Sequence, residues 1–364
     1  MKKVLLGILV LALVGAGIWM YKVEIITPTS SVHNDKDVVK IGVMWPLSGD
    51  AGYMGESAKV ALKLFAEDHK TKNSKYDYEI VLEDNQLNPA KSAIIAKKMI
   101  EVDKVNAIIT IGSNIGNAVA PISERAKVLQ MAIASAESIA EREYNFLIAT
   151  PPNKEAEKLI VSLKKNDIKN VALVTQNQAA MLSFTEAFKK INKDIEILSD
   201  DYINAGEKDY KILIAKMLRN NPDIVIANIY VPEISIFVKQ LKEAKPDVKV
   251  TAMESLAYPE DKSLFEGYWF VDAVVAEKSF VKRFEEVSGS DAIDYSYALY
   301  ASLEFLRDSF NKVGKDTQKV ADDFVFGGAF DTVMGKVSFD PKGIMQSEAS
   351  LKVIVNGKPV VIEE

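Results

Sequence analysis

The most constraining feature of the chain is a regular alternation that begins at Val38. Short runs rich in Val and Ile alternate with longer segments whose apolar residues recur at helical spacing. This order predicts an α/β fold in which helices cover both faces of parallel, doubly wound sheets. We expect strands at Val38–Met44, Tyr78–Leu82, Asn106–Ile111, Val128–Ala134, Val171–Thr175, Glu196–Asp200, Ile224–Ile229 and Val248–Ala252.

Local signals place helices and a boundary within this pattern. A helix is predicted over Glu56–His69, and another begins at Asn88–Pro89, where a capping residue precedes a proline at the first helical position. The proline-rich stretch Thr150–Asn153 interrupts the rhythm, and a second set of strand and helix units begins at Val171. A chain of 364 residues has room for two cores, so we expect two lobes.

The amino-terminal segment predicts export. Lys2 and Lys3 precede an apolar run, Val4–Met20, which as a helix would reach about 25 Å, slightly less than a hydrocarbon core. A cleaved signal peptide and an uncleaved membrane anchor both fit this pattern; we favour the anchor because Trp19 and Tyr21 suit a membrane interface. We therefore assign 1–22 to a signal peptide or anchor and 23–37 to a tether, and expect the remainder in the periplasm or at the cell surface.

Composition excludes several classes of function. The chain has no cysteine, so disulfides, thiolate nucleophiles, Cys-ligated zinc and a lipidated cysteine are excluded. A formal net charge of -6 without a dense basic run argues against nucleic acid as a partner. His33 and His69 lie among polar residues and are expected to be solvated, and Gly112–Gly116 is neither a P-loop nor a dinucleotide fingerprint. We expect no catalytic residue, metal or cofactor, and no nucleophile motif supports the alternative of an amidase or hydrolase.

Four passages carry a family resemblance. They are Ile41–Gly49 with Gly55–Glu56, Glu83–Ala90, Asn204–Tyr210 and Phe330–Asp340. Each passage alone is weak, but together they keep their order from Val38 to the end of the chain. Because of these four ordered passages, the chain resembles type I periplasmic binding proteins of the branched-chain amino-acid class. These are the substrate-binding subunits of ABC transporters for leucine, isoleucine and valine.

The resemblance implies a fold and a function. The family fold has two lobes joined by three crossings, with a ligand cleft between them. It would assign 38–151 and 272–326 to lobe I, and 152–271 and 327–364 to lobe II. The implied function is capture of an amino acid or similar small molecule, hinge closure, and delivery to the membrane subunits of an ABC permease. A sensor subunit, or a binder of amides, urea or aromatic acids, remains an alternative.

The resemblance also implies ligand-binding residues. An amino acid needs donors for its carboxylate and acceptors for its ammonium, because burying either charge unpaired is costly. Ala136 and Ser138 stand at the family's binding positions in the first lobe. In the second lobe Tyr230 and Glu254 stand where the family has a tyrosine and an acid, and the acid is the residue that faces the ammonium. Neither assignment needs a ligand to explain it: the Ser138 loop could simply cap a helix, and Glu254 could lie on the solvated surface. Trp45 could either stack on a ligand or pack between lobes.

Three positions depart from the family pattern. Gly116 stands where a serine is usual, leaving Ser113, Asn117 or a backbone N–H as substitute donors. Met54 and Ala180 stand where the family has aromatic rings that line the cleft. Since methionine fills irregular apolar space, the loss of two rings predicts a wider pocket and a ligand larger than valine.

Overall fold

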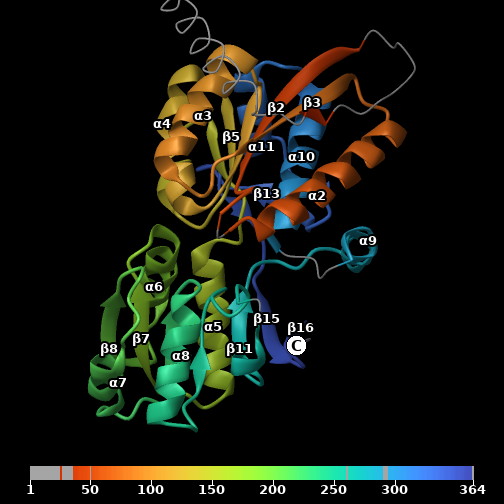
Figure 1. The fold of residues 1–364 in the computed structure, drawn as a ribbon. Coiled ribbons are helices and arrows are strands. Elements are labelled where there is room, and N and C mark those ends of the chain that lie inside the picture. Colours follow the sequence, from red (N-terminus) through yellow and green to blue (C-terminus); the bar gives the residue numbers. More distant parts are fainter. Residues whose placement is uncertain (1–24, 27–35, 50, 260, 290–293, 363–364) are drawn as a thin grey trace, which may run out of the picture.

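The computed structural model describes residues 25–26, 36–49, 51–259, 261–289 and 294–362 (Figure 1). The predicted signal peptide or anchor, 1–22, lies outside the described residues, as does most of the predicted tether. Among the residues that are described, no helix is long and apolar enough to cross a membrane.

The first sheet has six strands in the order β1-β3-β2-β4-β5-β6, and only β1 runs antiparallel to its neighbour. The strands are β1 (Ile25–Ile26), β2 (Asp37–Trp45), β3 (Tyr76–Asp84), β4 (Ala107–Ile111), β5 (Leu129–Ile133) and β6 (Asn145–Leu147). Helices α2 (Tyr53–Thr71) and α10 (Asp294–Val313) cover one face, and α3 (Pro89–Lys98) and α4 (Ser113–Ala126) cover the other. Alternate side chains of β2 explain this: Val39 and Ile41 enter one core, whereas Met44 enters the other.

The second sheet repeats the plan with four parallel strands in the order β10-β9-β7-β8. The strands are β7 (Asn170–Gln176), β8 (Glu196–Ile203), β9 (Ile224–Asn228) and β10 (Val250–Thr251). Helices α5 (Pro152–Lys165) and α6 (Ala179–Ile191) pack on one face, and α7 (Lys211–Leu218) and α8 (Glu233–Ala244) on the other. A strand is found at each of the eight predicted places, although β8 is only partly buried and β10 covers only two of the five residues predicted for it.

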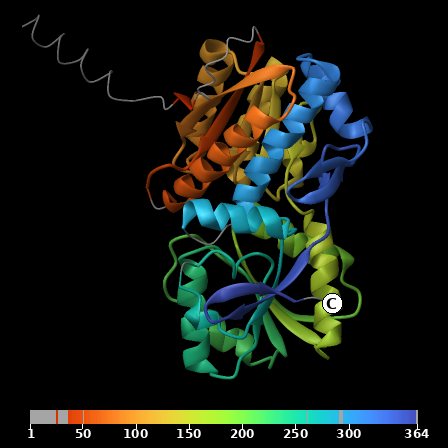
Figure 2. The same cartoon turned by 90° about the vertical axis from the view of Figure 1, so that its right-hand side faces the viewer.

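The rest of the chain crosses between the two groups of elements. It contains β11 (Trp269–Asp272), α9 (Lys278–Ser288), α11 (Thr317–Phe326), β12 (Phe330–Thr332), β13 (Gly335–Phe339), β14 (Met345–Gln346), β15 (Ser350–Val355) and β16 (Lys358–Val361). The sequence assigned all of 327–364 to lobe II. In the structure Val337, Phe339 and Met345 instead pack in the core of the first sheet, and only the segment from Ala349 packs with the second (Figure 2).

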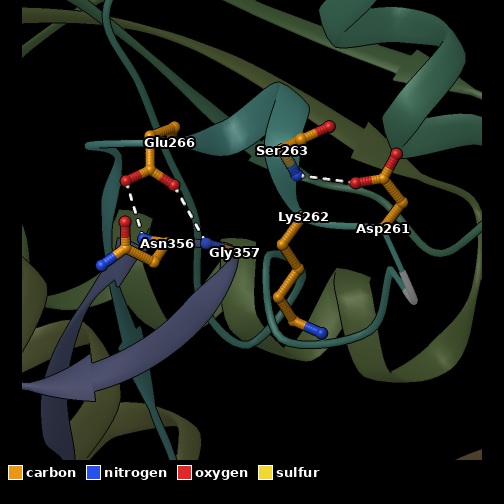
Figure 3. Close-up of a pocket in the computed structure, with 6 residues that line it drawn as sticks. All are labelled: Asp261, Lys262, Ser263, Glu266, Asn356 and Gly357. Carbon is orange, nitrogen blue, oxygen red and sulfur yellow. Dashed lines mark hydrogen bonds between the residues drawn. The ribbon is translucent and has the colours of Figure 1, made fainter.

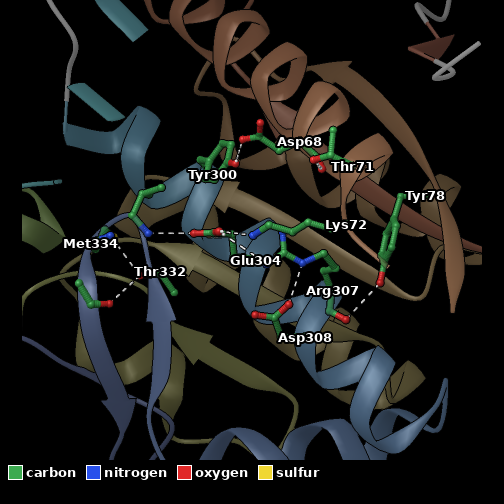
Figure 4. A network of polar contacts seen from close by, with 12 residues as sticks. Asp68, Thr71, Lys72, Tyr78, Tyr300, Glu304, Arg307, Asp308, Thr332 and Met334 are labelled. Atoms are coloured by element: carbon green, nitrogen blue, oxygen red, sulfur yellow. Dashed lines mark hydrogen bonds and ion pairs between the residues drawn. The ribbon is translucent and has the colours of Figure 1, made fainter. Parts of the chain in front are cut away.

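A buried polar network explains why the segment around β12 stays with the first sheet (Figure 4). Glu304 and Arg307 of α10 are almost fully buried. Glu304 accepts a hydrogen bond from the backbone N–H of Val333 at 2.9 Å and lies 3.7 Å from the Lys72 ammonium. Tyr78 donates to the carbonyl of Arg307 at 3.3 Å. Because buried charges are costly to leave unpaired, these contacts hold α2, β3, α10 and the returning strands together.

Two of the sequence motifs have local structural roles. Asp84 at the end of β3 accepts hydrogen bonds from the Leu47 N–H at 2.9 Å and the Ser48 hydroxyl at 2.5 Å, so it fixes the loop that follows β2. Asn88 caps α3 as predicted, since its side chain accepts from the Lys91 N–H at 2.9 Å.

His69 is not solvated, and that expectation was wrong. Its side chain is 7% exposed and lies between the rings of Phe65 and Tyr78, with centroids 6.2 and 4.9 Å away. The polar residues that follow it in sequence turn away as α2 ends. Burial lowers the pKa of His69 by disfavouring its charged form, although Asp77 opposes the shift.

This burial predicts an acid-sensitive contribution to stability. A histidine whose folded-state pKa is lowered binds fewer protons than the unfolded chain, so stability falls as the pH drops below about 6.5. We expect His69→Phe, which keeps a ring between the same neighbours, to lose less of its unfolding free energy between pH 7 and pH 5 than the wild type does. Urea unfolding at each pH measures this, and equal losses in both proteins would contradict it.

Candidate functional site

The topology of the two sheets marks where a ligand site should lie. In the first sheet the strand order reverses between β2 and β4, and in the second between β7 and β9. Open α/β sheets bind ligands beyond the carboxyl ends of strands at such switch points. Of the nine residues predicted from the sequence, four follow β5, β9 or β10, namely Ala136, Ser138, Tyr230 and Glu254, and two lie in the first turns of α4 after β4, namely Gly116 and Asn117.

The first sheet brings four of the predicted or substitute residues together. The Ser138 hydroxyl donates to the Asn117 side chain at 2.9 Å, and Ser138 is exposed. The Ser113 hydroxyl accepts from the backbone N–H groups of Ser135 and Ala136, both at 3.2 Å. The loop after β5 is thus tied to the first turns of α4, and the polar groups at this junction are the hydroxyl of Ser138, which is exposed, and the amide of Asn117 on α4, which is half-buried.

The glycine at position 116 has a packing explanation. A Cβ on Gly116 would lie 2.5 Å from Cδ1 of Ile139, which is fully buried. The serine usual in the family therefore does not fit at this position unless the Ile139 side chain moves. Gly116 thus has a packing role, since it leaves room for Ile139 against α4.

We expect Gly116→Ser to destabilise the fold by about 1–3 kcal/mol, the usual cost of overpacking a core. Adding Ile139→Ala should recover part of the loss, so that the two substitutions are not additive. Urea unfolding of the two single variants and the double variant measures the coupling. Strict additivity would contradict the proposed clash.

Trp45 and Met54 lie in the core rather than at the predicted site surface. Trp45 is fully buried, donates from Nε1 to the Met54 carbonyl at 3.0 Å, and its ring centroid is 6.2 Å from that of Tyr295. Met54 is 8% exposed in the same cluster. Trp45 was expected either to stack on a ligand or to pack between the lobes. The structure shows packing, but within the core of the first sheet and not between the lobes.

Ala180 is buried in the core of the second sheet at the start of α6. Its neighbour Ala179 packs against the cluster that contains Ala136 and Ile139 of the first sheet. The start of α6 therefore touches the loop after β5, which brings elements of the two sheets together beside Ala136.

The second sheet contributes an acid and two tyrosines. Glu254 is half-buried and adopts a left-handed backbone conformation with φ +59°, and its N–H donates to the Val271 carbonyl at 2.7 Å. The Tyr258 hydroxyl donates to Glu254 Oε2 at 2.5 Å, and the rings of Tyr230 and Tyr258 lie 5.2 Å apart. A non-glycine residue in this conformation is uncommon and is often found at functional sites.

Charged groups from distant segments surround this acid. Burial raises the pKa of Glu254 to about 7, and the nearby Asp272 carboxyl adds to the rise. The hydrogen bond from Tyr258 and the charge of Lys352 oppose the rise. Lys352 forms an ion pair with Asp272 at 2.8 Å, and both are buried. Burial and the Glu254 charge also raise the pKa of both Tyr230 and Tyr258.

The sequence analysis missed Tyr258, Asp272 and Lys352. They come from the loop after β10, β11 and β15, and no motif links them. A partial signal was available: Asp272 ends an otherwise apolar strand and Lys352 lies within another, where a buried charged residue needs a partner.

Other candidate sites have little support. Among the described residues, no group of three or more potential metal-ligating side chains has a suitable arrangement. Figure 3 shows an open hollow lined by Asp261, Lys262, Ser263, Glu266, Asn356 and Gly357. There Glu266 accepts from the N–H groups of Asn356 and Gly357 at 2.9 and 3.1 Å, so its carboxylate serves to fix the turn between β15 and β16.

Comparisons with known proteins agree with the fold. A family model described as periplasmic binding protein matches residues 38–357. The Leu/Ile/Val-binding protein of Citrobacter freundii is 24% identical over 326 residues, covering 84% of this chain and 87% of the relative. The branched-chain amino acid transporter substrate binding protein LivJ of Streptococcus pneumoniae, solved with isoleucine, has a TM-score of 0.78 at 19% identity, covering 90% of this chain and 100% of that one. A solute binding protein of an R. palustris ABC transporter, solved with benzoate, has a TM-score of 0.77 at 19% identity and covers 89% and 95%.

The chain has two α/β sheets of parallel core strands, and each has polar residues near the point where its strand order reverses. This is the architecture of a type I periplasmic binding protein. The chain belongs to the periplasmic binding protein family. Curated relatives that match most of its length include Leu/Ile/Val-binding proteins. The family resemblance predicted from the sequence is confirmed.

Proposed function

We propose that this protein is an extracytoplasmic solute-binding protein that captures one amino acid, or an amino-acid-like molecule, between its two lobes. The observation that carries the proposal is the half-buried Glu254 in its strained turn, with the Tyr258 hydroxyl on its carboxylate and Tyr230 beside it. A carboxylate held in this way is a strong partner for an ammonium group. The names of the relatives, which bind leucine, isoleucine and valine, support the same class of ligand.

The first lobe would bind the other end of the ligand. Ser138 and Asn117 offer a hydroxyl and an amide near the carboxyl ends of β4 and β5. The NH₂ group of Asn117 can donate to a ligand carboxylate, and the Ser138 hydroxyl can do so by turning away from Asn117 Oδ1. When one ligand binds to both lobes, it stabilises the closed arrangement by its extra affinity for that state. The closed form would then dock on the membrane subunits of an ABC permease, as the family implies; no catalytic step is needed.

An aromatic acid is the second candidate ligand. The solved relative with benzoate and the Tyr230–Tyr258 ring pair favour it. An aromatic acid has no ammonium, however, and its carboxylate would be repelled by an ionised Glu254. The zwitterion fits the charges of the second lobe better.

Export and anchoring complete the proposal. The family implies that the binding domain works outside the cytoplasm, and the predicted segment 1–22 would bring it there as a signal peptide or hold it at the membrane as an anchor.

A thermal-shift screen of the purified protein tests the ligand class. Binding to the folded state raises the unfolding midpoint by mass action. We expect a rise with leucine, isoleucine or larger apolar amino acids, and none with benzoate, urea or small amides. A rise with benzoate alone would keep the fold but contradict the roles of Glu254 and Ser138.

A further inference from the structure

Within the described residues the chain passes between the two sheets three times, and each crossing is short. The crossings are 148–156, 271–276 and 345–349. One end of each packs in the core of the first sheet, and the other end packs in a core of the second. Rotation of one lobe against the other must be absorbed by backbone dihedral angles in these segments. The three crossings together are therefore the hinge of the proposed lobe closure.

Backbone pairing holds the hinge at both of its ends. At the first sheet, Leu147, just before the first crossing, pairs with Ile344, just before the third. At the second sheet, β11 and β15 pair up to Asp272 and Ser350, which lie at the end of the second crossing and just after the third. Because these contacts fix both ends, the residues that can rotate are the few that lie between them.

A buried threonine lies in the middle of the hinge. Thr150, in the first crossing, is fully buried, and its Oγ1 accepts a hydrogen bond from the N–H of Val274 at 2.8 Å. The same atom forms a hydrogen bond of 3.0 Å with the hydroxyl of Ser347. A hydroxyl has one proton to donate and two lone pairs, so Thr150 can make both bonds at once. Val274 belongs to the second crossing and Ser347 to the third, so one oxygen atom joins all three.

Such a contact could act as a latch, which breaks when the lobes rotate, or as a pivot, which persists. Atoms close to a rotation axis move least, and a hinge axis passes close to the segments that connect the lobes. Breaking the contact would also leave the Val274 N–H without its partner, at the cost of an unpaired backbone donor. Both effects favour a pivot.

We propose that the Thr150 hydroxyl is the pivot of lobe closure. It holds the three crossings together in both the open and the closed arrangement, so that the lobes rotate about one axis instead of twisting independently. The inference rests on the proposed clamp and adds the point about which its lobes turn. It does not depend on which solute the clamp binds.

Hydrogen exchange at a single amide tests the pivot in the unaltered protein. The Val274 N–H is followed by NMR with and without saturating L-leucine. Because a pivot keeps its bond in both arrangements, we expect exchange at least about a hundredfold slower than in an unstructured peptide in both samples. Weaker protection in either sample would show that the bond opens when the lobes rotate, and would overturn the proposal.

Two substitutions isolate the hydroxyl. Thr150→Val keeps the shape of the side chain and removes both hydrogen bonds, whereas Thr150→Ser keeps the hydroxyl. We expect the Val274 amide to exchange about three- to tenfold faster in Thr150→Val than in the wild type, which is the usual contribution of one hydrogen bond. Thr150→Ser should stay near the wild-type rate. Equal rates in all three proteins would contradict the role given to the hydroxyl.

The distance between the lobes tests the mechanical role of the pivot. Spin labels at Lys63→Cys on α2 and Lys239→Cys on α8, both exposed positions, report this distance. Without its pivot the hinge has additional directions of motion, so we expect a broader distance distribution in ligand-free Thr150→Val than in the wild type or Thr150→Ser. A latch predicts that the populations of the same distances change without any broadening, and that result would overturn the pivot.

The matched control is Thr175→Val. Thr175 is also a fully buried threonine, but its hydroxyl bonds to that of Thr185 on α6 at 2.7 Å, within the second lobe. Its replacement should change neither the exchange of the Val274 amide nor the distance distribution. Failure of the wild type to bind L-leucine would contradict the proposed ligand. The ligand-free measurements on Thr150→Val would still decide the pivot, so the two failures are distinguishable.

Discussion

Replacing Glu254 by alanine should abolish the binding of a zwitterionic ligand at ordinary concentrations. The substitution removes the acceptor for the ligand ammonium and leaves that charge without a partner beside Tyr230 and Tyr258. Breaking a buried charge pair costs about 2–5 kcal/mol, which corresponds to about a thirtyfold to several-thousandfold loss of affinity. Isothermal titration with L-leucine measures the loss.

Two further variants make this result specific. Glu254→Gln keeps the shape but not the charge, and we expect a comparable loss for a zwitterion. Glu157→Ala removes an exposed acid and should leave the affinity unchanged. Wild-type affinity in Glu254→Ala would remove Glu254 from the site.

Trp45→Ala should be among the most destabilising single substitutions in the chain. Trp45 is fully buried, and its indole donates to the Met54 carbonyl at 3.0 Å. Removing a buried aromatic side chain costs about 3–5 kcal/mol through lost contacts and the cavity that remains. Urea unfolding followed by circular dichroism measures this.

Phe326→Ala is the matched control, because Phe326 is 80% exposed and its removal should change stability by no more than about 0.5 kcal/mol. If Trp45→Ala instead kept the stability of the wild type and lost ligand affinity, Trp45 would have to contact the ligand.

Sequence reasoning was most successful where burial and periodicity agree. Strands such as β4 and β9 are fully buried and flanked by amphipathic helices, so their runs of Ile and Val were visible in the sequence. The cap at Asn88 was also predictable, because it depends only on residues that are close in the sequence. The segment 330–345 was misassigned because its strands are short and partly exposed, and its attachment to the first core depends on Glu304, almost thirty residues earlier.

The candidate site was only partly predictable. The family pattern placed Glu254 and Tyr230 in the sequence, and the structure brings them together with Tyr258. The pattern could not indicate that the buried Asp272–Lys352 ion pair lies near Glu254, because these two residues come from strands β11 and β15, far apart in the sequence. Nor could it explain Gly116, whose constraint is a single methyl group of Ile139.

Movement of the two lobes on ligand binding tests the central claim most directly. The chain has no cysteine, so Lys63→Cys on α2 and Lys239→Cys on α8, both at exposed positions, allow a spin label to be attached in each lobe. We predict that saturating L-leucine shifts the measured distance distribution toward a single population that the ligand-free protein occupies little. An identical distribution with and without L-leucine, under conditions where titration shows that it binds, would contradict a clamp formed by both lobes.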